Sequence, residues 1–238
     1  MKKTIGILGG MGPEATSCFF DLIIKNTRAT KDQDHVQVLI YSNPKIPPRS
    51  EAILQRGPSP LPLLLESARA LRRAGADFVV IPCISAHYFL PQLGAKARIP
   101  FINLLEETAL YVKKKFPGLT QVGLVATTGT VQSKIIHNAF AKKGIEVIVP
   151  VARDQKKVME AIFGKRGIKA GVVAGRPKKI VLDVARKLIR EGAEALMAGC
   201  TEVPLVLKEK DLVVPLIEPM RIGAIACIRK AGYKVREE

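Results

Sequence analysis

The stretch FVVIPCISAH, residues 78–87, has the pattern of a buried strand that runs out into a cysteine, Cys83. A second stretch, ALMAGCTEVP at residues 195–204, repeats this design with Cys200 in the same place. In both, small and apolar residues precede the cysteine and a hydroxyl-bearing residue follows shortly after it. The sequence therefore indicates two similar strand-to-loop segments that each carry one thiol.

A second pair of segments supports this repeat. TIGILGGMG, residues 4–12, resembles QVGLVATTG, residues 121–129, with Gly6 and Gly123 at matching positions. The separations from glycine to cysteine agree, since 83 − 6 = 77 and 200 − 123 = 77. We therefore expect two similar half-molecules that each offer one cysteine to a shared cleft.

Strands alternate with helices in both halves, which favours parallel sheets joined by right-handed crossovers. The expected strands cover residues 4–9, 37–42, the segment before Cys83, 100–103, 121–126, 146–150, 195–199 and 214–217. The expected helices cover residues 14–27, 61–74, 86–93, 104–115, 131–143, 156–163, 178–191 and 221–230. The predicted fold class is α/β, with two similar lobes, each a parallel sheet flanked by helices. The lobes are expected to be related by pseudo-two-fold symmetry, with the active site in the cleft between them.

The repeat also predicts the division of the chain into lobes. The first lobe is expected to comprise residues 1–103 and 217–238, and it contains Cys83. The second is expected to comprise residues 104–216, and it contains Cys200. The last helix is apolar on one side, so it is expected to pack back on the first half.

The net charge of +17 over 238 residues is the most unusual global feature. It is compatible with a nucleic-acid surface, with attraction of small anionic substrates, or with solubility and thermostability. The basic residues are scattered through the expected helices, no basic tail is present and tryptophan is absent. These features favour solvated helix faces, so no nucleic-acid partner is expected.

The cysteines and the apolar segments indicate a cytoplasmic protein. The four cysteines lack the spacing of a disulfide framework, and no CxxC pair suggests zinc. Free thiols suit a reducing cytoplasm. The apolar run after Lys3 is too short for a signal peptide, and no apolar segment is long enough to cross a membrane, so no membrane partner is expected.

The two cysteines suit one kind of chemistry. The thiolate is the reactive form, and a cysteine at a strand end that faces a helix N-terminus can have a lowered pKa. Two thiols on opposite sides of one cleft could remove a proton from one face of a carbon and return one to the other, which inverts a stereocentre. The alternative is that Cys83 and Cys200 are small buried hydrophobic residues. Their matched spacing and the hydroxyls of Ser85 and Thr201 favour the catalytic interpretation.

Six segments carry a resemblance that spans nearly the whole chain in order. They are GILGGMGPEAT (6–16), NPKIPPRS (43–50), PCISAH (82–87), GLVATTGT (123–130), IKAG (168–171) and GCTE (199–202). With these motifs the chain resembles the aspartate/glutamate racemase family, which also includes hydantoin racemases and maleate isomerases.

The resemblance implies that Cys83 and Cys200 are the two catalytic bases, without pyridoxal phosphate, metal or nucleotide. One must be a thiolate while the other is a thiol, and the roles exchange with the enantiomer of the substrate. The implied substrate is a small anionic amino acid, with aspartate first, and the implied assembly is a homodimer.

The resemblance also implies substrate-binding residues. The α-carboxylate would be held by backbone N–H groups and helix N-termini together with the hydroxyls of Ser85, Thr127, Thr130 and Thr201. Arg49, which is expected in the proline-rich loop 43–50, and Lys169 match the basic pair that binds the second carboxylate. Arg49 suits this role because a guanidinium can engage both oxygens. Met11 and Ile84 complete the expected substrate-binding set.

One position departs from the family pattern. The family segment usually reads Cys-Asn-Thr-Ala-His, whereas Ile84 stands here in place of the asparagine and Ser85 preserves the hydroxyl. Loss of an amide donor costs about 1–3 kcal/mol where its partner stays unpaired. We therefore expect weak or shifted activity.

The neighbours of the cysteines have expected supporting roles. His87 follows Cys83 by four residues and is expected to support the site from behind rather than to bind metal, because no ligand cluster accompanies it. Glu202 could form a hydrogen bond near Cys200 and help set its protonation, or it could cap a helix. Cys18 and Cys227 fall within helical patterns and are expected to serve packing.

Three other functions compete with a racemase. The turn GILGGMG could bind a dinucleotide, but it lacks the G-x-G-x-x-G order, and no acidic residue ends the second strand. A non-catalytic module that binds dicarboxylates or amino acids remains open because of Ile84. A nucleic-acid binder would rest on charge alone.

Overall fold

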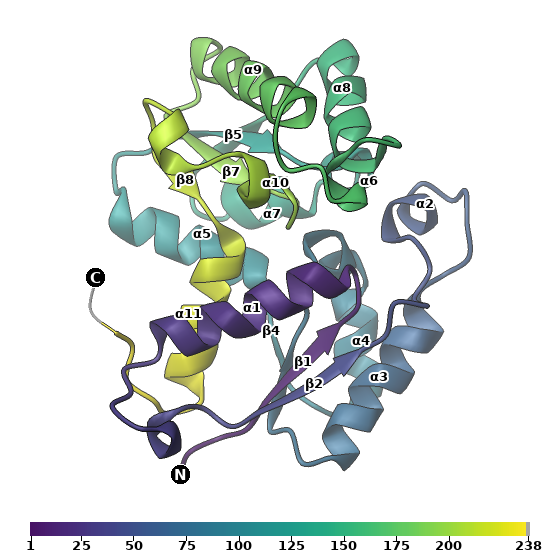
Figure 1. Ribbon diagram of the computed structural model, residues 1–238, viewed down its shortest axis with the longest axis vertical. Coiled ribbons are helices and arrows are strands. Elements are labelled where there is room, and N and C mark those ends of the chain that lie inside the picture. The colour runs from purple at the N-terminus through teal and green to yellow at the C-terminus, as the bar shows by residue number, and fades with distance from the viewer. Residues whose placement is uncertain (237–238) are drawn as a thin grey trace. The chain divides into compact units, whose positions relative to one another are not determined.

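The computed structural model describes residues 1–236, whose strands form two parallel four-stranded sheets (Figure 1). The first sheet has the strand order β2-β1-β3-β4 and the second has the equivalent order β6-β5-β7-β8. All neighbouring strands pair in parallel. The predicted α/β class, with two parallel sheets flanked by helices, is confirmed.

The elements follow the expected alternation. The strands are β1 (Ile5–Gly9), β2 (Val38–Ser42), β3 (Phe78–Val80), β4 (Phe101–Ile102), β5 (Gln121–Val125), β6 (Glu146–Ile148), β7 (Ala195–Ala198) and β8 (Leu216–Ile217). The α-helices are α1 (Pro13–Asn26), α2 (Arg49–Ile53), α3 (Leu61–Arg73), α4 (Leu90–Ala97), α5 (Leu104–Lys115), α6 (Thr128–Gln132), α7 (Ile135–Ala141), α8 (Ala152–Phe163), α9 (Arg176–Arg190), α10 (Val203–Val206) and α11 (Pro219–Lys230). Short 3-10 helices are η1 (Asp32–Asp34), η2 (Ile84–Phe89), η3 (Ile168–Ala170) and η4 (Glu209–Asp211).

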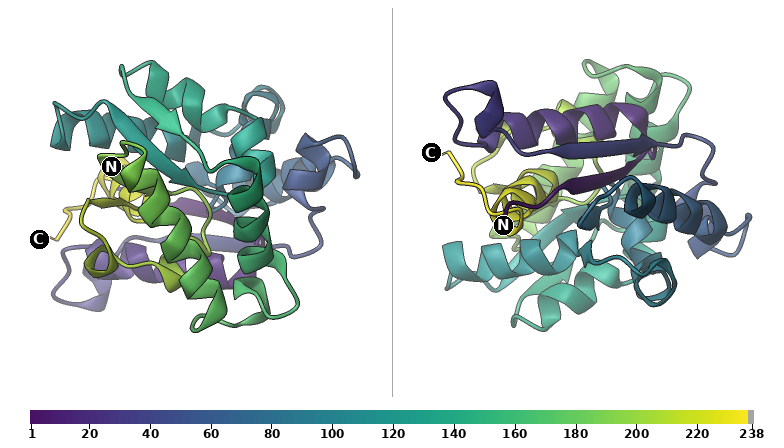
Figure 2. Two further views of the ribbon diagram at one scale, coloured as in Figure 1. Left: turned by 90° about the horizontal axis from the view of Figure 1, so that it is seen from above. Right: turned by 90° about the horizontal axis from the view of Figure 1, so that it is seen from below.

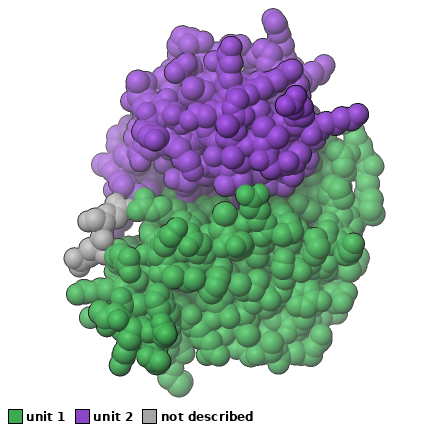
Figure 3. Space-filling model, in the orientation of Figure 1, with its two compact units in different colours: residues 1–107, 220–238 green, residues 108–219 purple. Residues whose placement is uncertain are grey.

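The chain divides into two compact units, coloured green and purple in Figure 3. The first unit contains residues 1–107 together with the C-terminal residues from Met220 onward. The second unit is the continuous stretch 108–219.

Helices α3 and α4 cover one face of the first sheet. Leu64 and Leu71 of α3 and Leu93 of α4 pack with Leu8 of β1 and Val79 of β3 in one buried cluster. Helix α1 lies on the opposite face, as the right view of Figure 2 shows with α1 in purple and α3 and α4 in blue. Both faces of the sheet are therefore covered, as the continuous apolar runs of β1 and β3 require.

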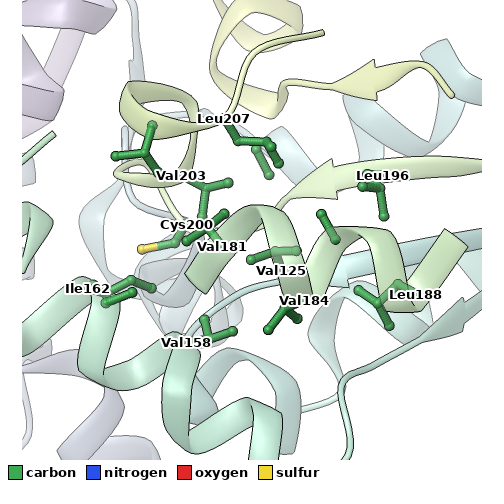
Figure 4. Close-up of a cluster of buried hydrophobic side chains, with 14 of the residues drawn as sticks. Val125, Val158, Ile162, Val181, Val184, Leu188, Leu196, Cys200, Val203 and Leu207 are labelled. Atoms are coloured by element: carbon green, nitrogen blue, oxygen red, sulfur yellow. The ribbon is translucent and has the colours of Figure 1, made fainter. Parts of the chain in front are cut away.

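Helices α8 and α9 cover one face of the second sheet in the same way. Val158 of α8 and Val181 and Leu188 of α9 pack on Val125 of β5 and Leu196 of β7 (Figure 4). The face of the sheet that these helices cover corresponds to the face covered by α3 in the first unit.

The two cores repeat at one constant offset. The two cysteines are 200 − 83 = 117 positions apart. The same offset relates buried core residues of the two units: Leu8 and Val125, Leu64 and Val181, Ala68 and Ala185, Leu71 and Leu188, and Val79 and Leu196.

A close contact beneath each sheet repeats at this offset as well. A Cβ added at Gly6 would lie 2.9 Å from Cβ of Ala76, and one added at Gly123 would lie 2.9 Å from Cβ of Ala193. Both positions therefore need glycine. The internal repeat predicted from the sequence is confirmed at the level of packing.

The C-terminal helix α11 completes the first unit. Ala224, Cys227 and Ile228 are fully buried, and a Cβ added at Gly223 would meet the side chain of Leu104 at 2.1 Å. The N–H of Lys3 donates a hydrogen bond to the carbonyl that follows this helix, at Ala231. The prediction that the last helix packs on the first half is confirmed.

Three local predictions were wrong. The expected helix at 86–93 is the 3-10 helix η2 followed by α4, which starts only at Leu90 with a proline in its first turn. The expected helix at 131–143 is broken between α6 and α7, because Lys134 adopts a left-handed conformation with φ 56°. Cys18 is exposed rather than packed, because α1 turns Ala15, Phe19 and Ile23 inward.

Candidate functional site

Cys83 lies just beyond the end of β3, at the start of η2. Its backbone is extended, and its carbonyl accepts a hydrogen bond from the N–H of Ala86. The side chain is buried, and Sγ lies 3.5 Å from Oγ of Ser85. The Ser85 hydroxyl can therefore donate a hydrogen bond to the sulfur or accept one from it.

His87 fixes the backbone of Cys83 from behind. The N–H of Leu104 donates to Nε2 of His87 at 3.1 Å, and Nδ1 lies 3.0 Å from the carbonyl of Cys83. Since Nε2 accepts, Nδ1 carries the proton and donates to that carbonyl. Burial lowers the pKa of His87 to about 4, so the ring is neutral near pH 7. It joins the Cys83 loop to the first turn of α5.

Ile84, between Cys83 and Ser85, is buried and offers no polar side-chain group. The position that holds an asparagine in the family pattern is therefore apolar in this protein. The sequence-based expectation of an altered binding site at this position rests on that side chain.

Arg49 and Met11 meet in the first unit. Arg49 begins α2 rather than lying in a loop, and its terminal nitrogens donate to the carbonyls of Ile46, Pro47 and Met11 at 3.1–3.3 Å. Its Nε is buried and has no hydrogen-bond partner among residues 1–236. Met11 belongs to the same buried cluster as Cys83. The Arg49 guanidinium therefore sits close to this cluster with its buried Nε donor unused.

Cys200 occupies the equivalent place in the second unit, two residues beyond β7. A Cβ at the preceding Gly199 would lie 2.4 Å from Leu124 and 2.8 Å from Ala126, so only glycine lets the chain turn there. Figure 4 shows Cys200 at the edge of the buried cluster.

Glu202 ties together three of the residues singled out from the sequence. Its Oε2 accepts hydrogen bonds from Sγ of Cys200 at 2.8 Å and from Oγ1 of Thr201 at 3.0 Å. Its Oε1 forms an ion pair with Nζ of Lys169, which lies on η3. The carboxylate is buried and is surrounded by these donors.

The electrostatics of this cluster favour an ionised Glu202 beside a protonated thiol. Burial alone would raise the pKa of Glu202, but the charge of Lys169 and the hydrogen bonds from Cys200, Lys169 and Thr201 outweigh it and lower the pKa. Burial, followed by the negative charge of Glu202, raises the pKa of Cys200 well above its ordinary value. The lowered pKa that a cysteine at a strand end can have is thus not found at Cys200, whose thiol forms a hydrogen bond with Glu202.

Thr127 and Thr130 shape the turn after β5. Thr127 caps α6, its Oγ1 accepts from the N–H of Thr130, and the two hydroxyls lie 3.0 Å apart. Both are buried.

Gln155 on α8 was missed by the sequence analysis. Its Nε2 donates to the carbonyl of Ala126 at 2.9 Å and to Oγ1 of Thr128 at 3.3 Å, which holds this turn in place. Its Oε1 is buried with no hydrogen-bond partner in the described part of the chain. A buried glutamine is uncommon, and the burial of Gln155 was not expected because α8 begins four residues before the predicted helix, which starts after this residue.

Each unit thus gathers part of the expected site. The first brings together Cys83, Ser85 and His87, with Met11 in the same core cluster and Arg49 bound to Met11. The second brings together Cys200, Thr201, Glu202 and Lys169. Within residues 1–236, no group of three or more histidine, cysteine, aspartate or glutamate side chains could hold a metal ion, and no helix could span a membrane.

Comparisons with known proteins agree with the fold of two parallel sheets flanked by helices. The family model described as Asp/Glu/Hydantoin racemase matches residues 8–227. An aspartate racemase from Picrophilus torridus has 30% sequence identity and a TM-score of 0.85, covering 98% of this chain and 96% of its own.

Two further relatives are similar over nearly their whole length. An aspartate racemase homologue from Pyrococcus horikoshii has 26% identity and a TM-score of 0.77, covering 98% of this chain and 100% of its own. The broad specificity amino-acid racemase RacX of Bacillus subtilis is 26% identical over 95% of both chains.

Proposed function

The chain belongs to the Asp/Glu/hydantoin racemase family, and on that premise we propose that it interconverts the D and L forms of a small amino acid, with aspartate first. The proposed mechanism uses Cys83 and Cys200 as two bases and requires no cofactor. The observation that carries it is the equivalence of the two cysteines. Cys83 follows β3 and Cys200 follows β7, which hold equivalent places in the two sheets, and the cysteines are separated by the same 117 positions as the paired core residues.

In the proposed reaction one cysteine is a thiolate and removes the α-proton of the substrate. The other is a thiol and delivers its proton to the opposite face of the α-carbon, so that the charges of the two cysteines are exchanged at the end. The protonated Cys200 beside Glu202 fits the role of the proton donor in the first turnover. The mechanism requires that both sulfurs reach the same α-carbon.

The proposed ligands of the substrate are charged and hydroxyl groups. We assign the α-carboxylate to Ser85, Thr127, Thr130 and Thr201. The distal carboxylate is assigned to Arg49, whose unused Nε supports an anionic ligand, and to Lys169. Met11 and Ile84 would pack against the substrate. His87 would hold Cys83 in position, and Glu202 would act on Cys200.

Exchange in deuterated water tests this proposal. Incubation with L-aspartate should label the α-position and abolish optical rotation without added cofactor. Cys83→Ala and Cys200→Ala should each lower the rate at least about 100-fold, since each removes a positioned acid or base. Cys18→Ala, which alters an exposed cysteine, is the matched control and should leave the rate unchanged. Undiminished exchange in either active-site variant would refute the two-base assignment.

A broader or shifted specificity is the second candidate, because Ile84 is apolar and buried and because one relative is a broad specificity amino-acid racemase. A panel of acidic and neutral amino acids should then show turnover that is not confined to aspartate. Ile84→Asn should raise the kcat/KM for aspartate about 5–150-fold if it restores a missing donor, given a cost of about 1–3 kcal/mol for an unpaired partner. An unchanged kcat/KM in this variant would count against the idea, and a silent panel would favour a binding protein.

The proposal also includes a cytoplasmic homodimer that does not bind nucleic acid. Sedimentation equilibrium should give twice the mass of the 25.9 kDa chain. Retention on DNA at physiological salt would contradict the expected absence of nucleic-acid binding.

A further inference from the structure

One carboxylate in the second unit occupies the groups that were expected to bind substrate. Lys169 and Thr201 are both assigned to substrate carboxylates, yet both bind Glu202 in the structure. The same carboxylate also accepts a hydrogen bond from the thiol of Cys200. Glu202 therefore takes the place that a dicarboxylic substrate would need.

The protonation of this cluster follows from its geometry. A sulfur and a carboxylate oxygen only 2.8 Å apart must share a proton, because two negative charges at that distance would repel each other. Lys169 keeps the negative charge on Glu202, so the proton stays on the sulfur. While Glu202 remains in this position, Cys200 is held as a thiol.

Both segments that carry the ion pair are also closed by backbone hydrogen bonds. The η3 turn that carries Lys169 is closed by backbone hydrogen bonds from Ala170 and Val172 to Gly167, and Ile168 anchors it in the core. On the other side, the N–H of Val203 donates to the carbonyl of Cys200. The Lys169 side chain is 29% exposed, whereas that of Glu202 is only 9% exposed, so an incoming anion can reach the lysine.

We propose that Glu202 is an internal substitute for a substrate carboxylate, which binds Lys169 and Thr201 in the resting protein and is displaced when a dicarboxylic ligand binds. Displacement breaks the contact between Glu202 and Cys200, so the same event that seats the ligand releases the thiol for proton transfer. This inference rests on the proposed function for its meaning in catalysis, but its binding step does not require turnover.

Succinate, an achiral dicarboxylate without an α-amino group, is the probe. Its dissociation constant would be measured by calorimetry for the wild type and for Glu202→Gln, in which the amide competes weakly for Lys169. We expect binding to become about tenfold tighter, within the usual range of couplings between contacting groups. Lys169→Met should weaken binding, and the gain from Glu202→Gln should vanish in the double variant.

Glu160→Gln is the matched control. It removes the same charge from the same unit, but Glu160 lies on the exposed face of α8 and pairs with Arg176. A similar gain in this control, or a gain that survives without Lys169, would show a general charge effect and overturn the proposal. Unchanged or weaker binding by Glu202→Gln, or no binding by any variant, would overturn it as well.

A measurement on the wild type avoids any effect of the substitutions on folding. The infrared S–H stretching band of Cys200, assigned by its loss in Cys200→Ser, should shift on addition of succinate as the hydrogen bond to Glu202 breaks. A band that does not move at saturating succinate would overturn the displacement. If these binding results hold but α-proton exchange fails, only the racemase proposal is lost; the reverse outcome removes only the present inference.

Discussion

We expect His87 to make the wild-type protein lose stability on acidification, and replacement of His87 by glutamine should remove this loss. His87 is fully buried between the Cys83 carbonyl and the Leu104 N–H, with a pKa of about 4 against an ordinary value of 6.5. Between these two values the unfolded chain binds a proton that the folded protein does not bind. Stability is therefore fully present above pH 6.5 and falls as the pH falls toward 4.

The magnitude follows from the difference in pKa. The difference between a pKa of 6.5 in the unfolded chain and about 4 in the folded protein contributes about 3 kcal/mol to the free energy of unfolding. About 2 kcal/mol of this contribution is lost between pH 7.5 and pH 5. The free energy of unfolding would be measured with urea and circular dichroism at both pH values. His87→Gln should be less stable at pH 7.5, but it should lose about 2 kcal/mol less than the wild type on acidification. Groups that the substitution does not affect contribute equally in both proteins and cancel in this comparison.

The tautomer of His87 gives a second and direct check. Nitrogen NMR should show the proton on Nδ1 and no titration of this ring between pH 7.5 and pH 5. Equal losses of stability in the two proteins, or a ring that titrates near pH 6.5, would refute the reasoning.

Three further changes test the packing and the electrostatics. Gly123→Ala should destabilise the protein by about 1–3 kcal/mol, because the new Cβ would lie 2.6 Å from Leu196, whereas Gly118→Ala meets open space and should be tolerated in thermal melts. Leu188→Ala should cost about 2–5 kcal/mol by urea unfolding, and a smaller loss would mean that the core closes over the gap. Glu202→Gln should lower the pKa of Cys200, so that iodoacetamide alkylates this cysteine faster at neutral pH; an unchanged rate by mass spectrometry would argue against the hydrogen bond.

Much of the fold could be predicted from the sequence, because the buried strands are short apolar runs that end in turns or cysteines. β1, β5 and β7 lie within one residue of their expected bounds. The expected helix at 131–143 failed because an apolar period does not reveal that Lys134 adopts a left-handed conformation between α6 and α7. Arg49 was expected in a loop because of the prolines before it, yet α2 starts there.

The site was less predictable, because its decisive contacts join segments far apart in the chain. Lys169 and Glu202 are recognisable as charged residues, but their pairing depends on how η3 and the Cys200 loop meet. Glu202 was recognised as a possible partner of Cys200, but the burial that contributes most to the raised pKa of this thiol depends on packing that the strand end alone does not reveal. Gln155 had no visible partner in the sequence, because the turn it supports lies 29 residues upstream at Ala126.

The placement of α11 has a consequence for how the chain is made. The second unit is one continuous stretch, so all its residues have been synthesised before α11 is made. The first unit needs its C-terminal residues, since α11 packs beside Leu104 and the N–H of Arg28 donates to the carbonyl of Lys234. The unit whose synthesis starts first can therefore complete its packing only after the rest of the chain has been made, and until then the apolar residues that α11 covers lack their partner.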